Sequence, residues 1–95
     1  MKNDNGKELD MFNIQLKQTV LYDTWNEQNA EYEIYSVIVM GNPTIIGKLR
    51  QDWMTGSYYY ELANGICRGH GRDLSLHQVL EYICDEWNGI KTKKV

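Results

Sequence analysis

The sequence has no long apolar run, and this absence limits where the protein is expected to reside. No stretch approaches the roughly 20 apolar residues that a membrane-spanning helix needs. The polar start of the chain, residues 1–8, is not followed by the hydrophobic segment of a signal peptide. We therefore expect a cytoplasmic protein with no membrane partner, in which both cysteines are reduced thiols.

An excess of basic charge is also missing. The formal net charge is −3 and the sequence pI is about 5.3, which argues against binding nucleic acid or anionic membranes through bulk charge. The low hydrophobicity of a disordered chain is absent too, because 42% of the residues are hydrophobic. Ninety-five residues are enough for one domain with a modest core.

Proline is rare, with one residue, whereas seven tyrosines and three tryptophans favour a protein that contains a sheet. We expect a disordered polar tail at residues 1–10 and a single α+β domain at residues 11–90. The last segment, residues 91–95, is expected to be a basic tail because it holds three lysines.

Period-two alternation of apolar and polar residues predicts four strands. The first begins at Met11 and runs for about ten residues, and the others lie at residues 31–40, 44–53 and 57–63. A bulge near Gln18 would shift the face assignments by one residue. The glycine-rich segment that follows, residues 64–72, is expected to be a loop.

The clearest local signal is an amphipathic helix at about residues 75–88. Ser75 and Gln78 form a capping box at its start, and Asn88-Gly89 is a normal helix end. Five apolar residues form one stripe at helical spacing: Leu76, Val79, Leu80, Ile83 and Trp87. Together the elements predict a four-stranded antiparallel meander (β-β-β-β-α) with a C-terminal amphipathic helix packed on one face.

Two cysteines and two histidines are the candidates for metal or nucleophile chemistry: Cys67, His70, His77 and Cys84. They could converge on zinc if the glycine-rich loop folded back on the helix, but their spacing is not that of a standard zinc finger. Cys67 with either histidine could form a nucleophilic pair, yet nothing marks a third, orienting group. Cys84 is more simply a small core residue. We therefore predict no catalytic residue, no metal and no cofactor.

The loop before the helix is a candidate anion or nucleic-acid site. Arg68, His70 and Arg72 alternate with glycines next to a helix start, a composition that suits phosphate. The segment does not match a known phosphate-binding fingerprint, and a flexible connection explains its glycines equally well.

The sheet face that the helix leaves uncovered is the second candidate surface. If the helix covers Ile34, Ile38, Ile45 and Leu49, the opposite face carries Tyr35, Val37, Val39, Ile46, Lys48, Arg50 and Tyr59. Such an apolar face with basic and aromatic residues is typical of an interface. A second copy of the chain, another protein or single-stranded nucleic acid could cover it.

These observations favour a small non-enzymatic binding module that acts through protein–protein contact. Its partner is another protein or the chain itself, as in a homodimeric adaptor or inhibitor. The alternative is a nucleic-acid-binding protein that uses the basic glycine-rich loop and the basic and aromatic sheet face. The acidic net charge places the protein partner ahead of nucleic acid.

Overall fold

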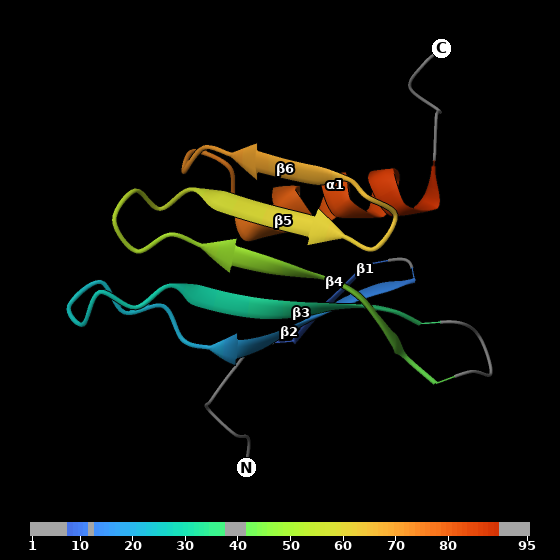
Figure 1. The fold of residues 1–95 in the computed structure, drawn as a ribbon, viewed down its shortest axis with the longest axis horizontal. Coiled ribbons are helices and arrows are strands. Elements are labelled where there is room, and N and C mark those ends of the chain that lie inside the picture. The colour runs from blue at the N-terminus through green and yellow to red at the C-terminus, as the bar shows by residue number, and fades with distance from the viewer. Residues whose placement is uncertain (1–7, 12, 38–41, 90–95) are drawn as a thin grey trace.

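The computed structural model describes residues 8–11, 13–37 and 42–89. Residues 1–7 of the predicted tail at 1–10, and the whole predicted tail at 91–95, lie outside the described part. Six strands and one helix occur within it: β1 (Glu8–Met11), β2 (Ile14–Val20), β3 (Ala30–Ser36), β4 (Thr44–Gln51), β5 (Tyr58–Leu62), β6 (Cys67–His70) and α1 (Leu76–Asn88). The strands form one antiparallel sheet in chain order, and α1 lies behind it (Figure 1). The α+β class and the C-terminal helix are confirmed, whereas the predicted count of four strands is wrong.

The first missed strand results from a reversal of the chain after Met11. β1 and β2 pair antiparallel, with Met11 opposite Ile14, where the sequence pattern predicts one continuous strand. Residues 8–10, assigned to the disordered tail from the sequence, are therefore part of the sheet. The reversal contains no glycine or proline, so the alternation gives no sign of a turn.

The second missed strand is β6, which lies within the segment predicted as a loop. Gly69 pairs with Tyr59 of β5, and a methyl group on Gly69 would come within 3.0 Å of the Tyr59 ring. The ring therefore covers the glycine, an arrangement that supports glycine in an edge strand. Four residues that include a glycine carry too little alternation to indicate a strand.

A bulge in β4 changes which side chains face the helix. Ile34 pairs with Gly47 and Tyr35 pairs with Ile45, which leaves Ile46 as the extra residue. The side chain of Ile46 turns into the core, where it is 4% exposed, and Ile45 faces the other way at 50% exposure. The predicted faces of these two isoleucines are therefore reversed.

A second irregularity lies in β2 between Gln18 and Val20, close to the position that the sequence marks by a polar residue on the apolar face. The side chain of Gln18 is buried, and its Nε2 donates to the carbonyl oxygen of Val20 at 3.2 Å. The bulge therefore brings a backbone acceptor within reach of a buried amide.

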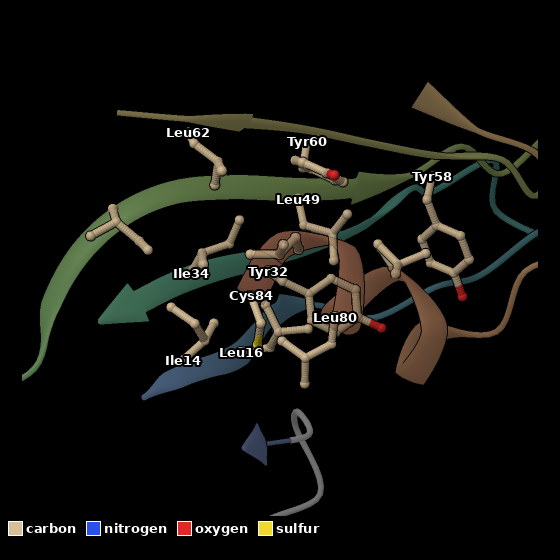
Figure 2. Packing of buried hydrophobic residues seen from close by; sticks show 14 residues of the cluster. Ile14, Leu16, Tyr32, Ile34, Leu49, Tyr58, Tyr60, Leu62, Leu80 and Cys84 are labelled. Atoms are coloured by element: carbon tan, nitrogen blue, oxygen red, sulfur yellow. The ribbon is translucent and has the colours of Figure 1, made fainter. Parts of the chain in front are cut away.

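The core forms between the sheet and α1 (Figure 2). The sheet contributes Leu16, Ile34 and Leu49, which are at most 1% exposed, and the helix contributes its apolar stripe. The predicted capping box of Ser75 and Gln78 is present, and the helix ends at a left-handed Gly89 with φ of 68°. Among the described residues, no helix has both the length and the apolar composition needed to cross a membrane.

Candidate interaction surfaces

The sheet face opposite α1, here called the open face, is strongly charged. Strands β2 to β5 contribute three basic and three acidic residues to it: Lys17, Lys48, Arg50, Glu31, Glu33 and Glu61. Part of this face is a concave region of about 750 Å³, lined by residues that include Glu33, Lys48 and Tyr59. Asp10 of β1 pairs with Gln15 and adds an exposed acidic residue to the same face. The face is thus more polar than the sequence analysis predicts, and acidic residues outnumber basic ones on it.

The structure places most of the predicted interface residues on or beside this face. Tyr35, Lys48, Arg50 and Tyr59 lie on it, and the half-buried Val37 follows β3. Ile46 is excluded because the β4 bulge puts it in the core. Val39 lies outside the described residues. Ile45, at 50% exposure, takes the place of Ile46 on this face, so the face keeps one apolar isoleucine side chain.

Arg50 and Tyr59 contact each other on the open face. The Arg50 guanidinium carbon lies 5.3 Å from the centre of the Tyr59 ring, a cation–π arrangement. The same ring covers Gly69 in β6. From β5, the Tyr59 side chain therefore contacts both neighbouring strands, β4 and β6. Although 41% of it is exposed, it also has a structural role.

The predicted anion site is not assembled, because Arg68 binds the helix. Arg68 Nε lies 2.5 Å from Glu86 Oε2, and the Tyr60 hydroxyl donates to Glu86 Oε1 at 2.5 Å. Burial, followed by the bond to Glu86, raises the pKa of Tyr60. The bond to Glu86 also raises the pKa of Arg68. One carboxylate thus joins β5 and β6 to α1 and neutralises the arginine.

The other two residues of the predicted anion site have different surroundings. The His70 ring lies between Tyr60 and Tyr82, with centroids 5.5 Å and 4.7 Å away. Arg72 lies beside the turn that joins β4 to β5, where a methyl group on Gly56 would be 3.2 Å from Arg72 Cβ. The basic residues of this segment therefore do not converge on one point.

The cysteines and histidines do not converge either. Cys67 is exposed on the open face, whereas Cys84 is buried in the core. Cys84 Sγ donates to the Met11 carbonyl oxygen at 3.5 Å, and burial raises the pKa of its thiol to about 11. No group of three or more His, Cys, Asp or Glu side chains suited to a metal occurs in the described part of the chain.

The β2–β3 loop is braced by Asp23. Asp23 Oδ1 accepts the backbone amides of Trp25 at 3.1 Å and Asn26 at 3.2 Å, and Oδ2 accepts the Asn26 side-chain amide at 2.7 Å. These bonds, the Asn26 side chain first, lower the pKa of Asp23. The loop ends with Glu27 in the left-handed region at φ 55°, a conformation that is uncommon for a residue with a side chain.

The β4–β5 loop has the same design around Asp52. Asp52 Oδ2 accepts the backbone amides of Met54 at 3.1 Å and Thr55 at 2.9 Å, and also the Thr55 hydroxyl at 3.1 Å. The bond from the Thr55 amide is the largest cause of a lowered pKa at Asp52. Gly56 then takes the left-handed position at φ 79°, a conformation that glycine adopts readily because it has no Cβ.

The two loops lie side by side at one end of the sheet (Figure 1, left). The Trp53 amide donates to Asn29 Oδ1 at 2.8 Å, and the Tyr22 hydroxyl donates to the Trp53 carbonyl at 3.4 Å. Four exposed apolar residues, here called the loop end, gather on them: Leu21 (44% exposed), Tyr22 (39%), Trp25 (91%) and Met54 (69%). Exposure of a tryptophan and a methionine to this extent is unusual for a surface without a partner.

The loop end is not identified from the sequence, because four of the six residues from Trp25 to Ala30 are polar and Trp25 stands alone among them as a large apolar side chain. The sequence nevertheless contains a pattern that indicates how both loops are braced. Asp23 and Asp52 each precede a large apolar residue by two positions and a short polar residue by three. Aspartate commonly caps amides two and three residues later in this way.

Comparison with known proteins finds no match to a protein family, a curated protein or a solved structure.

Proposed function

We propose that this chain is a non-enzymatic protein-binding module that contacts its partner through the loop end. The observation that carries the proposal is the exposure of Trp25 and Met54 on two loops braced in the same way by aspartate. Tryptophan and tyrosine dominate interface hot spots, and methionine is enriched in interfaces. A partner that buries the Trp25 side chain removes a large apolar area from water.

The bracing of the loops supports binding rather than mere exposure. Each aspartate fixes the two amides at the tip of its loop, so little ordering is left to occur when a partner binds. The left-handed Glu27 is a further sign, because such a conformation costs energy and persists only where surrounding bonds impose it. A loop held in this way fixes the backbone position from which the exposed Trp25 side chain projects.

The charge around the loop end indicates the chemistry of the partner. The two loops, residues 21–29 and 52–57, contain Asp23, Glu27 and Asp52 but no lysine or arginine. Arg72 lies beside Gly56, so one basic residue adjoins these three acidic residues. A partner with an apolar pocket for Trp25 and a basic rim would match this surface in both shape and charge. The same acidic charge opposes contact with an anionic membrane or with nucleic acid.

Nucleic-acid binding remains the second candidate, supported by the stacked pair of Arg50 and Tyr59 on the open face. Aromatic rings and arginines of this kind hold single strands. Two features weigh against it: Glu31 and Glu33 lie among the basic residues, and Arg68 is neutralised by Glu86. A mobility shift that weakens between low and high salt would support this candidate. Its absence would remove it.

Site-specific photo-crosslinking tests the proposal before the partner is known. A benzophenone amino acid replaces Trp25 in one variant and the exposed helix residue Glu81 in another. Illumination in cells that express each variant should yield a discrete crosslinked protein from position 25 and not from position 81. Equal crosslinking from both positions, or none from position 25, would contradict a role for the loop end.

A further inference from the structure

The six charges that β2 to β5 place on the open face follow a regular order across these strands. One row crosses four strands through paired positions, Lys17 with Glu33, Glu33 with Lys48, and Lys48 with Glu61. Read from β2 to β5, the signs in this row are plus, minus, plus, minus. Read in the opposite direction, they are minus, plus, minus, plus. Each position of the reversed row therefore carries the charge opposite to that of the original row.

The neighbouring rows have the same property. In one, Glu31 of β3 pairs with Arg50 of β4, and in another Tyr35 of β3 pairs with Ile45 of β4. If a second, reversed copy of these rows lies over the first, Glu31 lies over Arg50 and the ring of Tyr35 lies over the side chain of Ile45. In every row the point of reversal lies between β3 and β4, so a single axis serves all three.

We infer that the open face binds a second copy of this chain, face to face, about a two-fold axis that runs parallel to the strands between β3 and β4. This rotation reverses each row and keeps its position along the strands. Glu33 then faces Lys48 of the second copy, Lys17 faces Glu61, and Glu31 faces Arg50, each twice. Each of these six charges meets an opposite charge, and Asp10 of β1, in the row of Tyr35, lies outside the four strands that the pairs join.

The alternative two-fold axis, across the strands, fails on charge. A rotation about this axis would place each strand over the same strand of the second copy. If the axis followed the row of Lys17 and Glu33, Lys17 would face Lys17 of the second copy and Glu33 would face Glu33. Like charges placed opposite each other across an interface cost several kcal/mol. The order of charges therefore selects one arrangement of the two copies.

Within the monomer, Glu33 Oε1 accepts the Tyr35 hydroxyl at 2.6 Å and Arg50 stacks on Tyr59, but no salt bridge joins the described charges of the open face. The ion pair between Arg68 and Glu86 is the only one within 4.0 Å among the described residues, and it lies off the open face. The exposed Ile45 would be covered by Tyr35 of the second copy, which gives this apolar side chain a partner. Side chains of the second copy would also enter the concave region of about 750 Å³.

Sedimentation velocity over a range of protein concentrations gives the first test. The wild-type chain should approach twice its mass of 11.2 kDa as the concentration rises. Because the contacts are electrostatic, the Kd of the dimer should increase at least about tenfold between about 0.1 M and about 1 M salt. A monomer at all concentrations into the millimolar range would overturn the inference.

Two charge reversals then test the facing pair directly. Glu33→Lys alone places lysine opposite Lys48 of the other copy, and Lys48→Glu alone places glutamate opposite Glu33, so each variant should weaken its own dimer by about 100-fold or more. A mixture of the two variants should form a heterodimer, because the two lysines that one chain carries at positions 33 and 48 would face the two glutamates that the other carries there. Within each chain the like charges remain neighbours, so recovery in the mixture can arise only between chains.

The control is Glu81→Lys, which changes the net charge as Glu33→Lys does but lies on the exposed side of α1. It should leave the dimer unchanged, and circular dichroism should show that every variant is folded. Failure of the mixture to associate, or equal weakening by the Glu81 variant, would overturn the inference. Trp25→Ala should dimerise as the wild type does, so this test and the test of the loop end fail independently.

Discussion

Asp23 and Asp52 occupy equivalent positions in two hairpin loops of the sheet. Each carboxylate accepts the backbone amides two and three residues later and the side chain of the third residue. Each loop is closed by a bond from the aspartate amide to the carbonyl five residues on, at 3.0 Å and 2.8 Å. The same device thus presents Trp25 and Met54 at one end of the protein.

The first prediction concerns this bracing. Asp23→Ala removes the acceptor for the Trp25 and Asn26 amides, so their hydrogen exchange should accelerate while that of the core is unchanged. Asp23→Asn keeps one side-chain oxygen and should have a smaller effect. Exchange measured by NMR checks both variants. Unchanged exchange at Trp25 in the alanine variant would show that the aspartate does not brace the loop.

The second prediction is a pH dependence of the same loops. Bonds from the loops lower the pKa of Asp23 and Asp52 below the ordinary value of 3.8. A lowered pKa means that the stabilisation is complete above the ordinary value and is lost as the pH falls through the folded value. The amide shifts of Trp25 and Met54 should therefore titrate with midpoints below 3.8. Midpoints at or above the ordinary value would contradict these bonds.

The third prediction concerns the bond between Tyr60 and Glu86. Tyr60→Phe removes a hydroxyl that donates to a largely buried carboxylate, so it should lower the free energy of unfolding by about 1.5–3 kcal/mol. Urea denaturation measures the change. Tyr82→Phe is the matched control, because Tyr82 stacks on His70 through its ring, and its loss of a hydroxyl should cost less than about 0.5 kcal/mol. Equal costs would show that the bond contributes nothing.

How far the sequence predicts this structure depends on the element. The helix is predicted with its cap and stripe because Ser75, Gln78 and Gly89 are local signals that need no tertiary contact. The reversal after Met11 and the extra residue at Ile46 are missed. Turns without glycine or proline, and bulges, are set by pairing between strands, which no local pattern of one strand reveals.

The candidate surfaces are predicted unevenly for the same reason. Lys48, Arg50 and Tyr59 are correctly placed together on one face, since they follow from alternation alone. The order of the charges on that face depends on the register of Glu31 and Glu33, which only the pairing of the strands supplies. The loop end depends on two loops that are 29 residues apart in sequence, from Asp23 to Asp52, meeting in space.

The fourth prediction concerns the bulge in β4. A Cβ atom on Gly47 would collide with the backbone oxygen of Glu61, which cannot move without disturbing β5. Gly47→Ala should therefore destabilise the fold by about 1–3 kcal/mol in thermal or urea unfolding. Gly69→Ala meets only the side chain of Tyr59, which can rotate, and should cost less. A neutral Gly47→Ala would contradict the close packing of β4 and β5.

The fifth prediction separates the two thiols. Cys67 is exposed and should react with a thiol reagent at about pH 8, whereas Cys84 is buried with a pKa raised to about 11. The native protein should therefore release one equivalent of chromophore quickly and the second only on unfolding. Cys67→Ser should abolish the fast phase. Two fast equivalents in the native protein would contradict the burial of Cys84.

Titration calorimetry with the protein captured at position 25 tests the central claim most directly. The partner is titrated with the wild type, with the double variant Trp25→Ala/Met54→Ala, and with Thr24→Ala as an exposed neighbour in the same loop. The account predicts that the double variant weakens binding by at least about 30-fold, the loss typical of a hot spot, while Thr24→Ala binds as the wild type does. Wild-type affinity in the folded double variant would contradict it.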